Sequence, residues 1–448
     1  MIRALRLGHD TVRHNLLLAW CGLAFASFST AWLVTASTCD TTTCYWGLAA
    51  MMSVAGGVVL ALARPKESVK EARADLAVSI DAVAYADWQR VVPADNPYMQ
   101  LPYLRALERA GASMRYVVAY RDGQPVAAAS FQVLELDRDT VLRPEWRLPV
   151  RMVFSSLFER GHARALILGN ALHSWTGSFA HVPSLPEEEA GRLLADLARR
   201  VRRAEQGGGI SFTVLRDVEL GTDGMDSLDG AGYMPLTGVE PTMVVPLDPS
   251  WRGPADYAAA MSRKYRARLR RSRKKAAGLA KKDLTLQELL AQRAALEPLL
   301  DGVVDRADFK LARCSLDDVV ELKRGLGDRF IVRTYLDGEQ VVGFGAALAH
   351  ESRLEALLVG IDYDVNREVG LYQNMLYDFV EMGIERGCEQ VHLGRTALEI
   401  KSTVGAVARP LPILVRHRNP LVNKAVAVAL RFVDDVTWTP RNPFPEPS

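Results

Sequence analysis

The sequence lacks the patterns that mark several classes of protein. Its five cysteines form no Cys-x-x-Cys pair, and no Cys/His cluster has zinc-site spacing, so we expect no metal centre. No segment of about 20–50 residues repeats, which argues against a solenoid. No Ser/His/Asp order or nucleophile elbow is visible, which favours a reaction without a covalent enzyme intermediate. The net charge is only +2, so the whole-chain balance predicts no partner, and nothing in it indicates DNA binding.

The composition is that of an ordinary globular protein with two or three domains. The chain has 448 residues, of which 49% are hydrophobic and 24% charged. The sequence leaves the oligomeric state open.

Two long uncharged runs near the start predict a membrane hairpin. Leu16–Ser37 and Tyr45–Ala63 contain no charged residue, and each is long enough to cross a bilayer, which takes about 20 helical residues. Only Thr38–Cys44 separates them, so the two helices would lie antiparallel. A soluble helix pair fits less well, because such a pair needs a polar face.

The charges beside these runs predict their orientation. Arg and Lys residues precede the first run and follow the second, whereas the short connection has Asp40 and no basic residue. By the positive-inside rule, both ends face the cytoplasm of an inner membrane, as do the domains that follow. Cys39 and Cys44 would lie outside, as a small disulfide or as two thiols. A cleaved signal peptide, with 24–26 (Ala-Phe-Ala) as its site, is an alternative, although the first run continues well past that site.

Beyond the hairpin the pattern becomes mixed α/β. Two modules follow one another, each with a strand hairpin, a helix and further strands, and both hairpins have an Asp-Gly turn, at 122–123 and 337–338. The predicted boundaries are a hairpin anchor at 1–66, a helical linker at 67–86, a first α/β domain at 87–250, a second at 251–440 with a basic helix at 262–282, and a tail at 441–448.

The second module resembles a known family. Residues 330–348 read FIVRTYLDGEQVVGFGAAL, and 353–406 read RLEALLVGIDYDVNREVGLYQNMLYDFVEMGIERGCEQVHLGRTALEIKSTVGA. This is similar to the GNAT-fold family that includes the FemABX peptidyltransferases and BioF-like acetyltransferase domains. NPYMQLPYLRALERAG at 96–111, ILGN at 167–170 and KYRARLRRSRKKAAGL at 264–279 extend the resemblance to about residues 85–435. It implies tandem GNAT domains that transfer an acyl group to an amine.

The resemblance implies a phosphate loop between a central strand, 353–361, and the next helix. Its motif is (Arg/Gln)xxGx(Gly/Ala), and residues 367–372 match except that Tyr372 replaces a small residue. Backbone N–H groups and the helix dipole would hold the donor's phosphates there. The alternative is a plain helix start capped by Asn366 or Gly370. The predicted donor-binding residues are Asn366, Arg367, Gly370, Leu371 and Tyr372.

A second candidate segment is LGRTALEIKSTVGA, 393–406, at the carboxyl end of a strand, where ligands of α/β sheets gather. Arg395 and Lys401 are predicted to bind substrate anions. Glu399 is a candidate base, or else the ion-pair partner of those two cations.

Asp362, at the end of the central strand, is the other candidate base, or else a cap of the following turn. With Glu399 and Tyr372 it completes the predicted catalytic set. Asn170 is predicted to bind substrate in a cleft between the domains.

The basic helix at 262–282 holds eleven Lys or Arg residues and no acid. Its surface suits anionic lipid headgroups, a tRNA backbone or an acidic substrate, unless it is merely a solvated face.

The sequence therefore predicts a membrane-anchored N-acyltransferase. Acyl-CoA is the expected co-substrate, with no tightly bound cofactor, and the acceptor is an amine on a lipid or cell-envelope precursor. One alternative is a FemABX-like aminoacyltransferase that uses aminoacyl-tRNA. Another is a non-catalytic membrane scaffold that keeps a GNAT fold.

Overall fold

The computed structural model of this chain describes residues 72–138, 148–155, 157–158, 161–171, 177–205, 209–306 and 314–445. All of them lie in one compact unit, Lys70–Ser448. The predicted membrane hairpin, with Cys39 and Cys44, falls outside the described residues. Among the helices that are described, none is both long and apolar enough to cross a lipid bilayer.

The first sheet contains a parallel pair flanked by antiparallel strands. Its described strands follow the order β1-β2-β3-β4-β6-β15-β7, and β5 pairs with β3. The parallel pair is β4 and β6, which are in register from Ala165↔Phe212 to Ile167↔Val214. The strands are β1 (Arg73–Ala77), β2 (Met114–Arg121), β3 (Gln124–Asp137), β4 (His162–Leu168), β5 (Phe179–His181), β6 (Phe212–Arg216), β7 (Met234–Pro235) and β15 (Ile413–His417).

The second sheet is built on the same plan. Its order is β14-β8-β13-β12-β11-β10-β9, with β12 and β13 parallel. These two are in register only from Arg353↔Gln390 to Glu355↔His392, whereas β12 continues beside β11 as far as Ile361. The strands are β8 (Thr242–Pro246), β9 (Leu279–Asp283), β10 (Phe330–Asp337), β11 (Gln340–His350), β12 (Arg353–Ile361), β13 (Gln390–Gly394) and β14 (Val407–Arg409).

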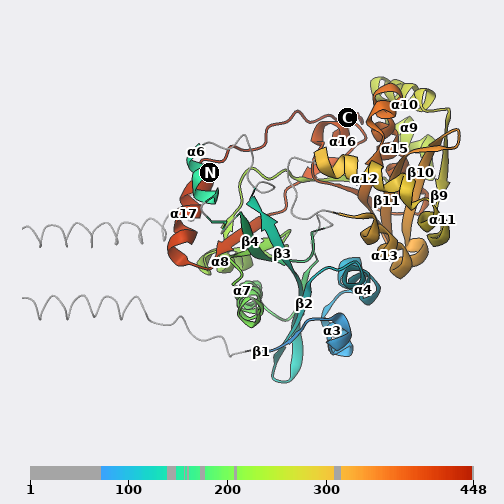
Figure 1. Ribbon diagram of the computed structural model, residues 1–448. Helices are drawn as coiled ribbons and strands as arrows, with labels where there is room; N and C mark the ends of the chain where they lie inside the picture. Colours follow the sequence, from blue (N-terminus) through green and yellow to red (C-terminus); the bar gives the residue numbers. More distant parts are fainter. Residues whose placement is uncertain are drawn as a thin grey trace, which may run out of the picture. The chain divides into compact units, whose positions relative to one another are not determined.

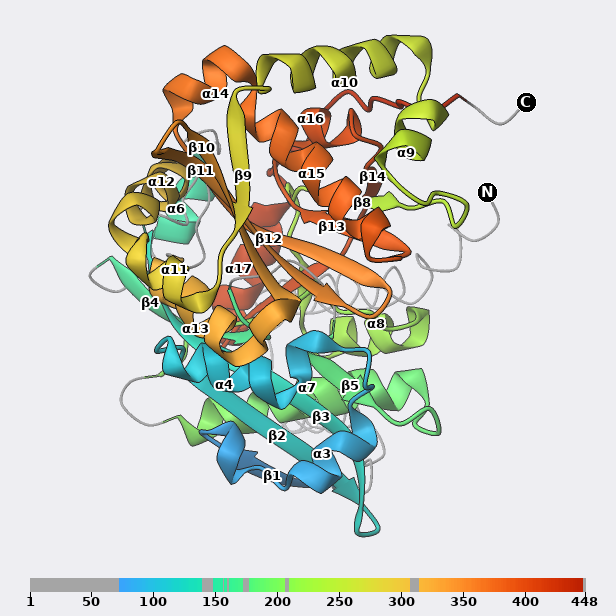
Figure 2. The same ribbon diagram turned by 90° about the vertical axis from the view of Figure 1, so that its right-hand side faces the viewer.

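Helices cover both sheets (Figures 1 and 2). We call each sheet, with the helices that cover it, one half of the molecule. In the first half, α7 packs on β2, β3 and β4, while α6 and α17 share a separate core with β4, β6 and β15. The helices are α3 (Tyr85–Val91), α4 (Leu101–Arg109), α6 (Leu148–Ser155), α7 (Glu187–Ala204), α8 (Thr222–Gly230), α9 (Pro254–Ala260), α10 (Arg263–Lys275), α11 (Leu286–Ala291), α12 (Arg293–Arg306), α13 (Leu316–Leu326), α14 (Tyr363–Val369), α15 (Leu371–Glu385), α16 (Leu398–Ser402) and α17 (Pro420–Leu430), with the 3₁₀ turns η1 (Ile80–Ala82), η2 (Pro97–Met99) and η3 (Gly327–Arg329).

The two halves exchange strands. β8, from the predicted first domain, pairs with β13 and β14 of the second sheet, and β15, from the predicted second domain, pairs with β6 of the first. The predicted boundary at residue 250 therefore does not separate the two sheets. Both strands are short, mostly buried apolar runs, and such a run does not indicate which sheet it will join.

One apolar core joins the two sheets. It runs from Trp88, Tyr103 and Leu107 in the first half to Phe330 and Phe344 in the second. Helices α4 and α13 meet there so closely that a side chain at Gly325 would lie 2.9 Å from the Pro102 carbonyl oxygen. The junction is thus packed like a protein interior.

The prediction of a helical linker over 67–86 is wrong for residues 73–77, which form a strand. Arg73–Ala77 form β1, which pairs antiparallel with β2, and η1 follows. The segment is rich in residues that favour helices, but the open edge of β2 offers a full row of backbone partners, and such tertiary context overrides a weak local preference.

Candidate active site

The segment after β12 was predicted to be a phosphate loop, and the structure forms the short helix α14 there. Asp362 caps it, since its Oδ1 accepts the N–H groups of Asp364 at 2.9 Å and Val365 at 3.2 Å. Asp362 thus satisfies backbone donors at a helix start, which is the alternative that the sequence had left open for it.

Asn366 and Gly370 shape the step from α14 to α15. Gly370 has a φ of 68°, a left-handed conformation that ends α14, and its N–H donates to the Asn366 carbonyl. The Asn366 side chain accepts the N–H of Tyr372 at 2.8 Å. A first-turn donor that a phosphate would otherwise use is therefore taken by the protein itself.

The other predicted donor-binding side chains point elsewhere. Arg367 is 75% exposed and pairs with Asp364. Leu371 is fully buried in the second-half core. Tyr372 packs against the same core, and burial raises the pKa of its hydroxyl. The side chains of Leu371 and Tyr372 are thus part of the core, and that of Arg367 is paired at the surface.

Gln373 is a polar site that sequence reasoning missed. It is 7% exposed, in the first turn of α15, and its Oε1 accepts bonds from Arg268 and Thr403, both at 3.3 Å. Its Nε2 is buried and has no partner among the described residues. A buried donor without a partner is costly, and this one lies where the helix dipole favours an anion. A glutamine at a buried position of an apolar helix was the available signal.

The predicted basic helix is α10, which ends at Lys275, while 279–283 form strand β9. Both elements are tied to α15: Arg273 of α10 and Lys281 of β9 pair with the buried Asp378, at 2.6 and 2.7 Å, and Asn374 donates to Ser272. Helix α10 also carries exposed cations, namely Arg263, Lys264, Arg268, Arg270, Arg271, Lys274 and Lys275.

Arg395 joins the two halves of the molecule. Its guanidinium, 11% exposed, bonds to the Asp217 carboxylate, to the Glu240 carbonyl and, at 3.2 Å, to the Leu411 carbonyl. Asp217 follows β6 of the first sheet, whereas Arg395 follows β13 of the second. The Arg395 Nε has no partner among the described residues.

From Asp217 the polar contacts continue through the first half. Arg216, itself buried, approaches Asp217 at 3.7 Å and donates to the Asn170 carbonyl at 2.9 Å. The Asn170 side chain reaches the Tyr103 hydroxyl at 3.5 Å. Asn170 is thus a buried member of this network.

Lys401 supports Arg395. Its Nζ is buried and donates to the carbonyls of Arg395 at 2.5 Å and Gly394 at 3.3 Å. These carbonyls belong to a turn in which Thr396 and Ala397 have φ of 67° and 50°. Burial lowers the pKa of Lys401 to about 7, against a smaller opposing effect from Glu240.

Glu399 lies on the surface. Its carboxylate accepts the Thr439 N–H at 3.3 Å and pairs with Arg441 at 3.5 Å. These contacts tie α16 to the C-terminal segment, and they give no support to a general-base role. Glu399 also does not make the ion pair with Arg395 or Lys401 that was the alternative.

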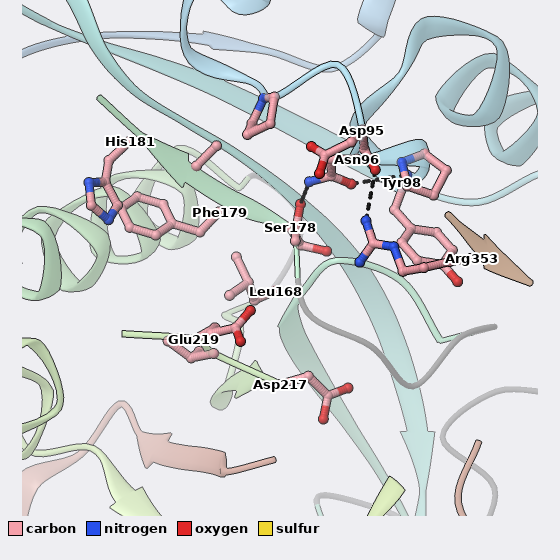
Figure 3. A pocket seen from close by; sticks show the side chains of 15 residues that line it. Asp95, Asn96, Tyr98, Leu168, Ser178, Phe179, His181, Asp217, Glu219 and Arg353 are labelled. Atoms are coloured by element: carbon pink, nitrogen blue, oxygen red, sulfur yellow. Dashed lines mark hydrogen bonds between the residues drawn. The ribbon is translucent and has the colours of Figure 1, made fainter. Parts of the chain in front are cut away.

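A cavity of about 300 Å³, which we call the junction cavity, lies where the two halves meet (Figure 3). It sits at the carboxyl ends of β4 and β6, a usual place for ligands in α/β folds. Arg353 of β12 closes one side, donating to the Asp95 carbonyl at 2.8 Å, and Asn96 holds the Gly177 carbonyl at 2.6 Å. The lining carboxylates are those of Asp95, Asp217 and Glu219.

Tyr98 connects this cavity to a buried acid–base pair. Glu355 and His392, opposite each other in β12 and β13, are 4% and 2% exposed, and their Oε1 and Nδ1 atoms lie 3.2 Å apart. Burial, with the nearby Glu355 charge, raises the pKa of the Tyr98 hydroxyl well above its usual value. Sequence reasoning missed both residues, although a charged side chain inside each apolar strand was visible.

Residues 263–402 match the sequence profile of the "Acetyltransferase (GNAT) domain" family. This part of the chain is a GNAT domain. The predicted GNAT resemblance is thereby confirmed for these residues, which include α10, α15 and the pair Glu355–His392. No curated protein sequence matches the chain.

Several solved structures align with the chain over most of its length. FemX aligns over 72% of this chain and 92% of its own, with 13% identity and a TM-score of 0.46. The C-terminal domain of a putative lysylphosphatidylglycerol synthetase from Agrobacterium fabrum aligns over 78% and 95%, with 13% identity and 0.43. A tandem GNAT protein from the clavulanic acid biosynthesis pathway aligns over 78% and 99%, with 9% identity and 0.46. Similarities this distant assign no activity.

The GNAT domain holds two of the three parts of the candidate site. These are the first turn of α15, with Gln373 and Arg268, and the parallel pair β12–β13, with Glu355 and His392. The third part, the cavity, is lined largely by the first half, and the bond between Arg395 and Asp217 links it to the carboxyl end of β13.

Proposed function

We propose that the chain is an N-acyltransferase that moves an acyl group from acyl-CoA to a primary amine bound in the junction cavity. The observation that supports it most is the placement of a cavity with three carboxylates beside Tyr98, Glu355 and His392, next to a GNAT domain.

The cavity suits an amine that arrives as an ammonium ion. Asp95 and Glu219 are exposed carboxylates that attract it, whereas Asp217 is already paired with Arg395. The amine must lose a proton before it attacks, and Glu355, reached through the Tyr98 hydroxyl, is the acceptor we assign. The nitrogen lone pair then forms a bond to the acyl carbonyl carbon, the carbon–sulfur bond breaks, and the thiolate takes up the proton that the new amide nitrogen loses.

The first turn of α15 is the site we assign to the donor's phosphates. Gln373 offers a buried N–H donor, and Arg268 adds a charge next to it. Together with the helix dipole, these groups replace the contacts expected from Arg367 and Asn366.

A second donor is favoured by one observation. Besides Arg268, helix α10 carries six exposed cations, more than a pyrophosphate needs, and such a row suits the backbone of an aminoacyl-tRNA. On this reading the acceptor cavity keeps its role, and only the acyl carrier changes.

We further propose that the first sheet forms a second, GNAT-like domain, since its parallel pair β4–β6 repeats the arrangement of β12–β13. The uncharged runs at 16–37 and 45–63 would anchor the chain in the inner membrane, with the catalytic part in the cytoplasm. An acceptor on a lipid or a lipid-linked precursor would then be close at hand.

The test gives the full chain one of two donors, acetyl-CoA or aminoacyl-tRNA, each labelled in its acyl group. The acceptor is either phosphatidylethanolamine in vesicles or a lysine-bearing peptide. We expect label on the amine from acetyl-CoA, and a rise in the KM for that donor in the double variant Arg268→Ala/Gln373→Ala. The pair Arg109→Ala/Gln100→Ala, on and beside α4, is the matched control. If only aminoacyl-tRNA transfers its label, it replaces acyl-CoA as the proposed donor. If neither donor transfers its label, the alternative of a non-catalytic membrane scaffold is favoured.

A further inference from the structure

An exposed apolar patch covers one end of the first half, on α6, α17 and the turn after α17. Of the eight large apolar side chains exposed in the described part of the chain, four lie here: Met152, Leu421, Val428 and Phe432, which are 64%, 76%, 54% and 52% exposed. Soluble proteins seldom gather such side chains without a partner.

Helix α17 has two distinct faces. Its inner face, with Val426, Ala429 and Leu430, packs in one core with Val150 and Phe154 of α6. The two helices lie side by side in Figure 1 and contact each other. The core is therefore already filled without the outer face.

The outer face forms a continuous stripe. Leu421, Ala425, Val428 and Phe432 are all exposed, and they follow one another at intervals of four, three and four residues. That spacing keeps Leu421, Ala425 and Val428 on one side of α17, and Phe432 follows in the turn after it. Met152 is a further exposed apolar side chain on the neighbouring helix α6.

The charges within the segment that carries the stripe have one sign. From Arg418 to Val433 the chain has no acidic residue, and the first carboxylates after it are those of Asp434 and Asp435. Lys424 and Arg431 each follow a stripe residue by three positions, and Arg151 precedes Met152; all three are exposed. None of the three forms an ion pair with a described residue.

We propose that this patch, which we call the α6–α17 face, docks on the surface of an anionic phospholipid bilayer. Apolar side chains would enter the interface while Lys424, Arg431 and Arg151 meet lipid phosphates, as in interfacial amphipathic helices. A second copy is disfavoured, because two such faces would bring cations against cations. This contact would orient the catalytic part on the membrane, and it is separate from the reaction and from the predicted anchor.

The experiment places an environment-sensitive fluorophore on Val428→Cys in the full chain, reconstituted in nanodiscs of phosphatidylglycerol and phosphatidylcholine or of phosphatidylcholine alone. Wild-type protein treated with the same reagent gives the background from other cysteines. The readouts are quenching by nitroxide-labelled lipid and by aqueous iodide. Because the predicted anchor is the same in every sample, these readouts report on the face alone.

In anionic discs we expect lipid quenching and severalfold protection from iodide. Both should fall in phosphatidylcholine and in the double variant Lys424→Glu/Arg431→Glu. The pair Arg109→Glu/Arg203→Glu, exposed arginines of α4 and α7, should leave them unchanged. A label that stays open to iodide in anionic discs overturns the proposal. So does equal protection from iodide, without lipid quenching, in both kinds of disc, which would mean that a segment of this chain or a second copy covers the face.

Discussion

At the scale of single residues, the main feature is an acid and a base buried opposite each other in β12 and β13. Glu355 and His392 lie inside a sheet, where ionisable groups are costly unless they are paired, and Tyr98 places them next to a cavity. Such an arrangement is typical of functional sites, although structural ion pairs share it. A role in catalysis and a role in packing lead to different results on mutation.

We predict that Tyr98→Phe lowers kcat by about 10²-fold while the KM for the acyl donor stays the same, because the proton path to Glu355 is cut. The matched control is Tyr120→Phe, which removes a hydroxyl that bonds Asp87 at 3.0 Å outside the site. Steady-state kinetics with a primary amine measure both variants. Equal activity of the two variants would remove Tyr98 and Glu355 from the mechanism.

For Asp362, in contrast to Tyr98, we predict that a conservative substitution leaves catalysis intact. Since it acts as a helix cap, Asp362→Asn keeps the acceptor oxygen and should leave both activity and stability nearly unchanged. Asp362→Ala should cost about 1 kcal/mol in the free energy of unfolding. Urea denaturation and an activity assay distinguish these outcomes. A large loss of kcat in the Asn variant would restore Asp362 as the base.

The lowered pKa of Lys401 predicts that the stability of the fold depends on pH. Its pKa is about 7 when folded and 10.5 ordinarily, so between these values the unfolded chain binds the extra proton. The free energy of unfolding should therefore rise from pH 7 towards 10.5, by at most about 1.4 kcal/mol per pH unit from this residue. Lys401→Met removes this contribution, and the gap between wild type and variant should widen from pH 7 to 9. A constant gap would show that Lys401 stays charged in the fold.

At the scale of elements, α10 is clamped to α15 by the buried Asp378. This carboxylate binds Arg273, Lys281 and the Tyr335 hydroxyl, the last at 2.6 Å. The clamp brings the cations of α10 to the first turn of α15, where the proposed donor site lies.

We predict that Asp378→Asn destabilises the protein by about 3 kcal/mol, because two partly buried cations lose their shared partner. Asp283→Asn removes a more exposed pair with Arg333 and should cost about 1 kcal/mol or less. Urea unfolding of the two variants gives the comparison. Similar costs would mean that the clamp contributes no more than a surface ion pair.

The sequence predicted those elements whose signal is local. Asp-Gly turns located both strand hairpins. It could not predict β1 or the exchange of β8 and β15, since each depends on which distant strand edge is open. For the site, it predicted that Arg395 and Lys401 bind substrate anions, whereas in the structure Arg395 bonds to Asp217 and Lys401 bonds to two carbonyls. These partners come from the fold alone. Gln373, Glu355 and His392 were missed because a polar residue in an apolar element becomes informative only when its neighbours are known.

At the scale of the whole described unit, the exchange of strands and the shared apolar core hold the two halves together. The cavity is lined from both halves, so its shape depends on their junction and on the bond between Arg395 and Asp217. A GNAT domain at 263–402 alone would therefore lack most of this cavity, to which we assign the acceptor.

The measurement that most directly tests acceptor binding in the junction cavity is amine-dependent thiol release from acetyl-CoA by the double variant Asp95→Asn/Glu219→Gln. Our account predicts that the KM for the amine rises about three- to tenfold, as expected for two lost exposed charges, while the KM for acetyl-CoA is unchanged. Asp223→Asn/Asp226→Asn on α8 serves as control and should alter neither. A rise in the KM for acetyl-CoA, or no change in either constant, would contradict the account.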